Sequence, residues 1–526
     1  MVSELKSLRL LREVEASIPE GSLMRLLRKG YQDYPGKNCL VWPDQNLTYA
    51  EAYKRAYTFA IYLSYVLKVK RGDVVLVSLM NVIDFPLIVA GIQCLGARLA
   101  LMSAAAASID YKHIVELLHP KVAVAARTED CHGLLTADPE IHIIGWNCTG
   151  DKIDPYVNII RRPIFLDRWD LPFVDEQEFQ VILFSSGSTG QPKAIVNQER
   201  AFLDNAISLA ASLEVTFDDT VYVPVPFSHV YGYLGMHVAL SCGATLVSLA
   251  RYTPELSLAQ QTGAQISVYL GVTTMYMREM RINSDGSAGS VALRVGLVAG
   301  ASIPATSFID YEERFGCRLI QSWGMTETAA TLTCANLNES QAIRSRSVGS
   351  PIVGVDVSAD ANTGELICKA DHLMLGYLVD GRIVPPRLDE LGWYRTGDIG
   401  VFDSVGRLYI TGRIKDMVIR GGINIFPSEI ENIYQDHPNV IECYMVGYPD
   451  PELGERTCLC VVLKHPAIDS AYDLREYARD RIEKCKYPDT VLKMDDMPRL
   501  SNGKIDRRQL KKQISDILDP AHRDRW

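Results

Sequence analysis

Long apolar runs are missing from this sequence of 526 residues. No stretch reaches the roughly 18 apolar residues that a membrane-spanning helix needs, so no membrane span is expected. The first residues carry charges and lack the apolar centre of a secretion signal. The closing HRDRW matches neither a peroxisomal address nor a prenylation box. The 12 cysteines form no CxxC pair and no metal-ligand spacing, which predicts a reduced, cytoplasmic setting.

An excess of positive charge is missing as well. Asp and Glu (64) outnumber Lys and Arg (54), and the net charge is −10 at pH 7. A nucleic-acid-binding protein needs a basic face, so no nucleic-acid partner is expected. The hydrophobic fraction of 47% and the charged fraction of 22% are those of an ordinary globular protein. This length predicts two or more domains.

Strand and helix signals alternate in the first part of the chain. Residues 74–79 predict a buried strand, residues 85–95 a helix and residues 97–101 a second strand. This spacing is typical of a parallel crossover unit. Two further strands, at residues 122–125 and 141–144, are expected to extend the same sheet.

Other local signals predict caps, connections and helices. Thr48 and Glu51 are spaced as a capping box at the start of a helix that is expected to end near Lys70. Residues 145–175 are polar and predict a surface connection. The remaining elements expected before residue 245 are helices at 201–213 and 236–241 and a strand at 220–225.

The most informative stretch is a polar loop between two apolar runs. Residues 181–184 and 194–196 are apolar, and residues 185–193 between them read SSGSTGQPK. Small hydroxyl residues and glycines let backbone N–H groups converge into a nest for an anion, and Lys193 adds a mobile positive charge. The common phosphate loop, GxxxxGK[ST], has a different pattern. The loop therefore predicts phosphate binding, with a flexible surface linker as the alternative.

The same nine residues resemble the nucleotide loop of the adenylate-forming superfamily, [ST]SG[ST]TGxPKG, with Ala194 in place of the usual glycine. The superfamily includes acyl- and aryl-CoA synthetases, adenylation domains and beetle luciferases, and motifs similar to its own run from about residue 47 to 508. The resemblance implies an α/β fold. A large N-terminal domain, residues 1–413, would contain parallel and mixed sheets, helices and a β region. A small, mobile α+β C-terminal domain would occupy residues 414–526.

Two further motifs resemble the nucleotide site of the family. SWGMTE at residues 322–327 is similar to [YW]GxTE, in which Trp323 offers a flat face to a purine and Glu327 an oxygen ligand to Mg²⁺. WYRTGD at residues 393–398 is similar to WxxTGD, and Asp398 could accept hydrogen bonds from both ribose hydroxyls. The alternatives are an ordinary core residue for Trp323, an acid at a helix start for Glu327 and a capping aspartate for Asp398.

A third motif resembles the sequence segment that lines the acyl pocket in members of the family. Relatives that activate amino acids place an aspartate near PFSHVYG, residues 226–232, whereas this chain has Ser228 and His229 there. A buried ammonium without a counter-ion is costly, so an amino-acid substrate is not expected. A packed, non-functional histidine is the alternative for His229. The implied pocket, which suggests an aryl or short-to-medium acyl group, consists of His229, Tyr231, Gly232, Gly300 and Met325.

The last motifs resemble the domain boundary and the small domain of the family. Residues 408–416 imply that Arg413 reaches ribose or phosphate oxygens and that Lys415 is the hinge between the domains. Gly421 and Gly422 resemble the loop that lines the pantetheine tunnel of CoA ligases, which favours CoA. Ser428 is expected to cap the helix that follows.

The resemblance implies four catalytic residues, Lys504, Glu327, Thr326 and His229, with Glu327 also the metal ligand. Lys504 lies in LSNGK, where Leu500 replaces the usual hydroxyl residue. The implied cofactor-binding residues are Ser185, Ser186, Gly187, Ser188, Thr189, Gly190, Lys193, Gly300, Ala301, Ser322, Trp323, Gly324, Met325, Asp398, Ile410, Arg413, Gly421 and Gly422.

The implied function is ATP- and Mg²⁺-dependent activation of a carboxylic acid to an acyl-adenylate. Pyrophosphate is released, and the acyl group then passes to a thiol, in CoA or in an acyl carrier protein. Two alternatives stay open. One is a stand-alone adenylating enzyme that uses a carrier protein, an amine or another acceptor, and this group includes nitrite-activating, diazotising relatives. The other is a catalytically silent binding protein that kept the fold.

Overall fold

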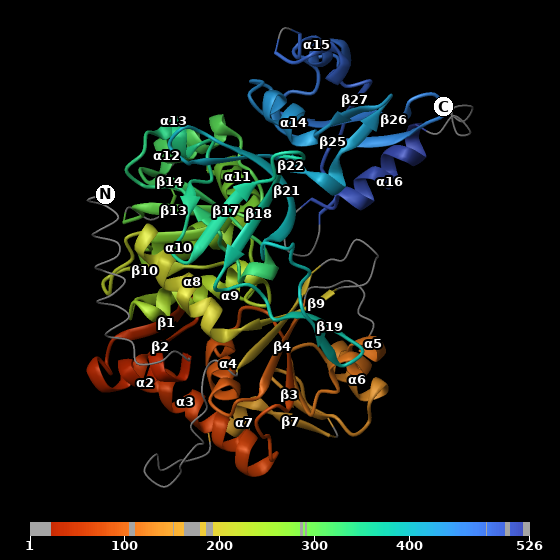
Figure 1. Cartoon of the computed structure of the whole chain (residues 1–526). Coiled ribbons are helices and arrows are strands. Elements are labelled where there is room, and N and C mark those ends of the chain that lie inside the picture. Colours follow the sequence, from red (N-terminus) through yellow and green to blue (C-terminus); the bar gives the residue numbers. More distant parts are fainter. Residues whose placement is uncertain are drawn as a thin grey trace.

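The computed structural model describes residues 23–104, 111–150, 152–161, 179–185, 193–283, 288–289, 292–479, 481–499 and 505–518. Figure 1 shows a large body that carries a smaller unit at one end, formed by the C-terminal part of the chain (blue). This arrangement confirms the predicted α/β fold with a large N-terminal and a small C-terminal domain. Within the described residues, no helix is long and apolar enough to cross a membrane.

The large body is built on two sheets, each of nine strands among the described residues. In order across the first, the strands are β20 (Arg382–Val384), β19 (Gly376–Val379), β9 (Lys193–Gln198), β8 (Gln180–Ser185), β4 (Arg98–Ser103), β3 (Val74–Leu79), β5 (Val122–Ala125), β6 (His142–Gly145) and β7 (Ile153–Pro155). In order across the second, they are β16 (Ser350–Pro351), β15 (Thr333–Cys334), β14 (Arg318–Trp323), β13 (Val295–Ala299), β12 (Val268–Val272), β10 (Thr220–Tyr222), β11 (Thr245–Val247), β1 (Asn38–Trp42) and β2 (Gln45–Thr48).

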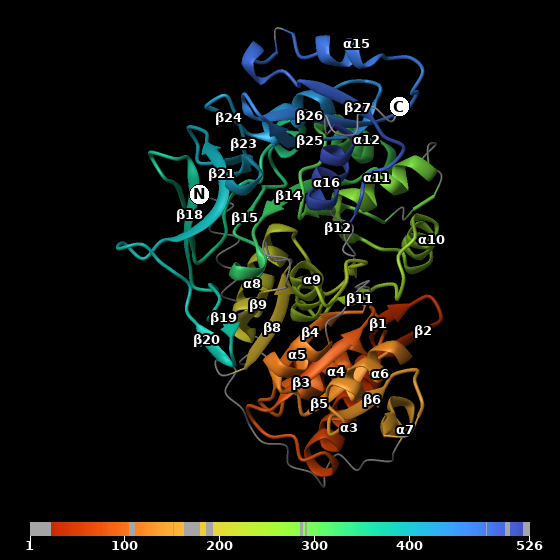
Figure 2. The ribbon, with the colours of Figure 1, turned by 90° about the vertical axis from the view of Figure 1, so that its right-hand side faces the viewer.

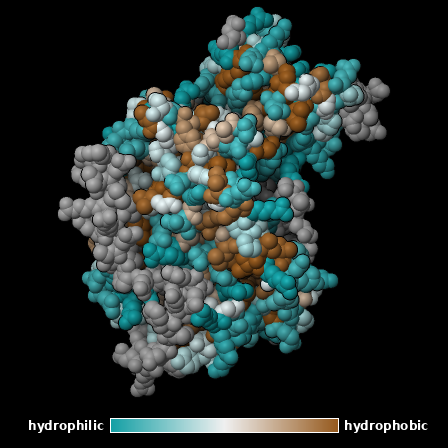
Figure 3. All heavy atoms as spheres, viewed as in Figure 1, coloured by the Kyte–Doolittle hydropathy of each residue, from teal (hydrophilic) through white to brown (hydrophobic). Residues whose placement is uncertain are grey.

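Helices cover and separate these sheets, as Figure 2 shows from the side. They are α2 (Leu23–Asp33), α3 (Tyr49–Ile61), α4 (Phe85–Gln93), α5 (Tyr111–Leu118), α6 (Thr128–Ala137), α7 (Tyr156–Ile160), α8 (Glu199–Ser212), α9 (Val230–Ser241), α10 (Pro254–Ala264), α11 (Thr273–Ile282), α12 (Ala305–Phe315) and α13 (Gln341–Arg344). Every residue of α9 is buried, as its near-continuous apolar sequence requires of a central helix. The face seen in Figure 3 is mostly hydrophilic, with apolar groups gathered near its middle.

Two smaller sheets complete the chain. The first contains β17 (Val355–Ala359), β18 (Glu365–Ala370), β21 (Tyr394–Phe402) and β22 (Leu408–Arg413). The second, in the small domain, contains β23 (Val418–Arg420), β24 (Ile423–Ile425), β25 (Val440–Asp450), β26 (Gly454–Leu463) and β27 (Thr490–Lys493). Around it lie α14 (Pro427–Gln435), α15 (Ala471–Glu476) and α16 (Arg507–Leu518). The chain changes sheets between β22 and β23, through the 3₁₀ turn Ile414–Asp416.

Several local predictions are confirmed. Strands β3 and β4 are parallel neighbours joined through α4, and β5 and β6 extend their sheet. The capping box is present, because Thr48 Oγ1 accepts the Glu51 N–H at 3.3 Å and a Glu51 carboxylate oxygen accepts the Thr48 N–H at 2.8 Å. Short apolar runs were therefore sufficient to predict these four strands of the sheet.

Other local predictions are wrong. The α-helix after Thr48 ends at Ile61. A π-helical turn, Tyr62–Val66, follows it directly, so the helical segment stops before the predicted residue 70. The described part of the segment 145–175 contains β7 and α7, because Tyr156 is buried against the core, whereas residues 151 and 162–175 lie outside the described residues. Helix α9 begins at Val230 rather than at residue 236, and the strand predicted over residues 220–225 is only three residues long.

The helix expected to start at residue 429 begins earlier. Pro427 occupies its first turn, a position that suits a residue with fixed φ and no N–H. Ser428 therefore lies inside the helix, and its hydroxyl donates to the Thr411 carbonyl on β22 instead of capping. This contact joins the small domain to the last strand of the large one.

A buried carboxylate fixes α11 within the large domain. Glu279 accepts hydrogen bonds from Ser257 (2.6 Å), Tyr269 (2.8 Å), Gln261 (3.0 Å) and Tyr252 (3.2 Å). Burial raises the pKa of Glu279 from 4.5 to about 7, although these hydrogen bonds oppose the shift. The ionised form is therefore disfavoured in the native state.

We expect this group to make stability depend on pH. Because the native pKa lies above the unfolded value, its contribution is complete below about pH 4.5 and is lost as the pH rises through about 7. The loss is about 3 kcal/mol. Glu279→Gln keeps the shape and most hydrogen bonds but removes the titration, so the variant should lose this slope. Urea unfolding between pH 4.5 and 8 measures it, and an unchanged slope in the variant would contradict the assignment.

Candidate nucleotide and phosphate site

Three predicted site residues from separate motifs meet in one hydrogen-bonded group. Trp323 ends β14, and its indole N–H donates to one carboxylate oxygen of Asp398 at 2.7 Å. The other oxygen of Asp398 lies 2.8 Å from Nε of Arg413. Asp398 and Arg413 are cross-strand partners on β21 and β22, which explains how residues far apart in the sequence face each other.

The carboxylate of this group is enclosed while its cation is open to solvent. Asp398 is 3% exposed, whereas the side chain of Arg413 is 47% exposed. A carboxylate has about four acceptor positions, so two remain for further donors such as a pair of hydroxyls. The half-exposed guanidinium beside it can reach an anion. Together they can bind a polyol that carries a phosphate.

A second group joins the exit of the polar loop to the acidic turn. Ser185 and Lys193 are opposite each other in the antiparallel pair β8–β9, so the loop between them is closed at its base. Nζ of Lys193 lies 5.2 Å from the ring centroid of Tyr377. The Tyr377 hydroxyl donates to Glu327 at 3.2 Å and lies 3.5 Å from the Tyr394 hydroxyl.

The two tyrosines are residues that sequence reasoning missed as site members. Burial, together with the negative charge of Glu327, raises the pKa of both Tyr377 and Tyr394, so both stay protonated and can donate hydrogen bonds. The available signal was positional, since Tyr394 stands within WYRTGD and Tyr377 follows Gly376 at the start of β19.

The site fits a Mg²⁺ ion that arrives with a phosphate ligand. No cluster of three or more His, Cys, Asp or Glu side chains suited to a metal exists among the described residues. Glu327 is half-buried and supplies a single carboxylate near a lysine. Mg²⁺ is commonly held by one or two carboxylates with substrate phosphates and water completing its shell.

The turn that carries Glu327 is strained and tightly packed. It forms a 3₁₀ turn, Thr326–Thr328, followed by Ala329 and Ala330 with φ of 49° and 93°. Such backbone angles are unfavourable for alanine and often occur near functional groups. The Thr326 carbonyl accepts from Asn197 at 3.2 Å, and the Glu327 carbonyl accepts from Met374 at 2.8 Å. Neighbouring elements therefore hold the turn in place.

Gly324 is required by this packing. A Cβ at residue 324 would lie 1.6 Å from the Ala330 carbonyl oxygen. We expect Gly324→Ala to lower the free energy of unfolding by about 3 kcal/mol, since the backbone must move. Gly263→Ala, in α10 with nothing within 4 Å of the new Cβ, should instead raise it by about 0.5–1 kcal/mol. Urea unfolding of both variants tests this pair, and equal effects would contradict it.

The predicted pocket residues lie around the ends of β13, β14 and α9. Gly300, with φ of 84°, and Ala301 are exposed just after β13. Tyr231 is 6% exposed and its hydroxyl donates inward to the Leu297 carbonyl at 2.9 Å. Gly232 lies against Pro226, where a Cβ would meet the carbonyl oxygen at 2.2 Å. The side chain of Tyr231 is therefore held in one position.

The remaining predicted residues fall into three groups. His229 occupies the position just before α9 without a side-chain capping bond and, like Met325 and Ile410, is half-buried, whereas Ser322 is buried in β14. Gly421, Gly422 and Lys415 are exposed in the small-domain region. Outside the described residues lie Ser186, Gly187, Ser188, Thr189, Gly190 and Lys504.

Comparisons with known proteins point to one family. A family model described as "AMP-binding enzyme" matches residues 27–378, and one described as "AMP-binding enzyme C-terminal domain" matches residues 429–504. A putative acyl-CoA synthetase, YngI, of Bacillus subtilis is 31% identical over 348 residues, which are 64% of this chain and 63% of that protein. The 2-succinylbenzoate–CoA ligase of Bacillus licheniformis is 26% identical over 487 residues, 90% and 97% of the two chains.

The match spans about three-fifths of the length of the first curated relatives. Among solved structures, the anthranilate CoA ligase AuaEII in complex with anthranoyl-AMP superposes with a TM-score of 0.85 at 20% identity, over 95% of this chain and 98% of that one. MatB from Rhodopseudomonas palustris, bound to ATP, superposes with a TM-score of 0.83 at 22% identity, over 94% and 99%. These superpositions establish the fold.

Proposed function

Because the chain belongs to the AMP-binding enzyme family, we propose that it activates a carboxylic acid with ATP and transfers the acyl group to the thiol of CoA. The first step forms a bond between a carboxylate oxygen and the α-phosphorus of ATP, and the bond to pyrophosphate breaks. The second forms a thioester and releases AMP. The observation that carries this proposal is the meeting of Trp323, Asp398 and Arg413.

These three residues suit the nucleoside end of ATP. Asp398 would accept the ribose hydroxyls, Arg413 would contact ribose or phosphate oxygens, and Trp323 would lie beside the purine. Trp323 is only 8% exposed and donates to Asp398. Trp323 would then have two roles, to hold the Asp398 carboxylate in place and to border the base.

The second group suits the phosphate end. A carboxylate that attacks ATP approaches another anion, so negative charge must be offset before the bond forms. Lys193 and the loop residues 185–190 would hold the outer phosphates, and Lys504 would lie between the acid and the α-phosphate. Mg²⁺ held at Glu327 would neutralise charge on the leaving pyrophosphate. Position and electrostatics are sufficient, and no covalent bond to the enzyme is needed.

The acceptor is proposed to reach the site through the small domain. Gly421 and Gly422 have φ of 55° and 83° and are exposed in the turn between β23 and β24, which leaves room for a thin pantetheine arm. Lys415, exposed in the turn Ile414–Asp416, would be the hinge about which the small domain rotates between the two steps. The proposed domain boundary is after residue 413.

The acid is proposed to be an aryl or short-to-medium acyl group. Tyr231 is buried and its hydroxyl is tied to Leu297, so it forms a rigid wall of the pocket. The 2-succinylbenzoate and anthranilate ligases among the similar proteins act on compact aromatic acids according to their names, which supports the same class.

A panel of carboxylic acids tests the function. Purified protein with ATP and Mg²⁺ is given each acid, and pyrophosphate release is measured with and without CoA. We expect release with at least one aryl or short acid, together with a CoA thioester. Release without thioester formation would favour a stand-alone adenylating enzyme with another acceptor. No release with any acid would favour a binding protein that kept the fold.

A further inference from the structure

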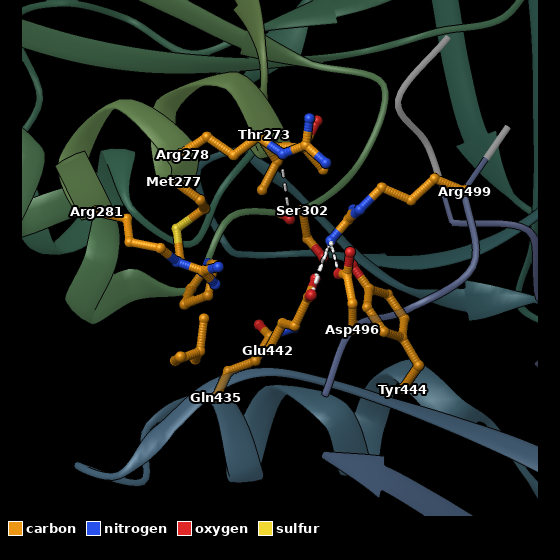
Figure 4. A pocket seen from close by; sticks show the side chains of 13 residues that line it. Thr273, Met277, Arg278, Arg281, Ser302, Gln435, Glu442, Tyr444, Asp496 and Arg499 are labelled. Carbon is orange, nitrogen blue, oxygen red and sulfur yellow. Dashed lines mark hydrogen bonds and ion pairs between the residues drawn. The ribbon is translucent and has the colours of Figure 1, made fainter. Parts of the chain in front are cut away.

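A cavity of about 70 Å³ lies between the two domains, and arginines from both domains line it. Arg278 and Arg281 come from α11 of the large domain, and Arg499 comes from the small domain. Figure 4 shows Arg281 and Arg499 extending into the same space from opposite sides, with Ser302 between them. None of Lys193, Glu327, Trp323, Asp398 or Arg413 lines this cavity, which borders the predicted site only where Thr273 and Ser302 adjoin Ala301.

Positive charge exceeds negative charge around the cavity. Its two carboxylates, Glu442 and Asp496, both face Arg499, at 2.7 Å and 3.8 Å from Nη2. Neither Arg278 nor Arg281 forms an ion pair with any residue that the structure describes, and both are exposed. Three guanidinium groups against two carboxylates leave one net positive charge, concentrated on the side of α11.

Buried donors in the cavity lack acceptors. Arg499 uses Nη2 for Glu442, but its Nε and Nη1 are buried and have no hydrogen-bond partner in the described part of the chain. Buried N–H groups without acceptors are uncommon and costly. The first turn of α11 also faces the cavity. The residue before this helix, Val272, has no side-chain acceptor for the N–H groups of that turn. A helix N-terminus of this kind favours an anion.

We propose that this cavity binds a phosphate group, held between Arg278 and Arg281 on one domain and Arg499 on the other. A volume of about 70 Å³ is several times the roughly 10–15 Å³ that one water needs on this measure, so a small anion fits. Planar guanidinium groups match phosphate oxygens well. A ligand that contacts both domains binds only this domain arrangement, and it therefore shifts the population toward it. This proposal does not depend on the proposed enzymatic function.

Titration calorimetry of the full chain at constant ionic strength tests the site. Inorganic phosphate and ribose 5-phosphate are the two probes, because the phosphate could be free or carried by an organic molecule. We expect saturable binding of at least one of them, weakened tenfold or more in the double variant Arg278→Gln/Arg281→Gln. Binding of inorganic phosphate alone would identify the free anion, whereas equal or tighter binding of ribose 5-phosphate would identify an organic phosphate.

Matched variants separate this cavity from other anion sites. Arg382→Gln changes an exposed arginine on β20 and should leave the affinity unchanged. Lys193→Ala removes the lysine of the polar loop and should leave the cavity intact. Arg281→Lys keeps the charge and should retain more binding than Arg281→Gln. Because the Asp398–Arg413 group could also hold a sugar phosphate, the titrations are repeated in an Asp398→Asn background. In that background, saturable binding that survives the double variant, or that disappears only in Lys193→Ala, would overturn the proposal, as would no saturable binding at all.

Hydrogen exchange tests separately whether the bound anion contacts both domains. Hydrogen exchange should slow on addition of the bound probe both in α11 and in β25, which contributes Glu442 and Tyr444 to the cavity. The double variant should show neither change while keeping the far-UV circular dichroism of the wild type. Slowing confined to α11 would overturn the shared site, because it would place the anion on the large domain alone.

Discussion

We expect ATP–pyrophosphate exchange to fall by about 10²–10³-fold when Asp398 is replaced by asparagine. The carboxylate is 3% exposed and accepts from Trp323 and Arg413 at the same time. An amide supplies one acceptor oxygen in place of two and carries no charge, so it cannot satisfy Trp323, Arg413 and a ribose together. Each hydrogen bond to a charged group contributes about 1.5–3 kcal/mol, and the loss of two at the lower end of this range, about 3–4 kcal/mol, corresponds to 10²–10³ in rate.

A matched pair on the same hairpin provides the control. Asp403 accepts from Arg407 Nε at 2.6 Å near the β21–β22 turn, but both side chains are partly exposed and lie away from Trp323. Asp403→Asn should change exchange less than threefold, because partly exposed ion pairs contribute little. If Asp398→Asn and Asp403→Asn had equal effects, the group at Trp323 would be structural rather than part of a nucleotide site.

Glu327→Gln is expected to lower the same exchange rate by about 10³-fold or more. Glutamine keeps the length of the side chain and can still accept the hydrogen bond from Tyr377, but it no longer binds a divalent cation strongly. Charge neutralisation by a metal is worth several kcal/mol in such a reaction, and about 4 kcal/mol corresponds to 10³ in rate. The Mg²⁺ concentration that gives half-maximal rate should also rise.

Tyr377→Phe separates charge from orientation in this group. The variant retains the carboxylate and the aromatic ring beside Lys193, and it loses the donor to Glu327 at 3.2 Å and the long contact of 3.5 Å to the Tyr394 hydroxyl. A loss below about tenfold is expected, since one hydrogen bond is removed. If the Mg²⁺ dependence of the rate were unchanged in Glu327→Gln, a metal-binding role for Glu327 would be refuted.

Sequence patterns predicted many of the strands well, because a strand that is buried in a parallel sheet is a short, nearly continuous apolar run in the sequence. Residues 74–79 form a strand with the predicted bounds, and every side chain in it is buried. Helix limits were less predictable. The start of α9 at Val230 could not be read from a helix that is apolar on all sides, since periodicity then carries no information. Pro427 similarly displaced the start of α14, and with it Ser428.

The candidate site was predictable in its motifs but not in its internal contacts. Trp323, Asp398 and Arg413 were each identified for a separate reason, and only folding makes the first a donor to the second. Tyr377 was missed because a Gly-Tyr pair at the start of a short strand has no chemical signature of its own. Its importance comes from pairing between β19 and β9, which are about 180 residues apart in the chain and whose register no local pattern specifies.

That pairing constrains where insertions can be tolerated. Ile195 stands opposite Tyr377, and Ala194 opposite Leu378, so the hydrogen-bond ladder that begins at Lys193 also sets which way Tyr377 points. One extra residue within β19 would turn the phenol to the other face of the sheet, whereas an extra residue in the β19–β20 turn would leave the ladder intact. Length variation among homologues should therefore collect at Asp380 and Gly381 and be absent from the four residues before them.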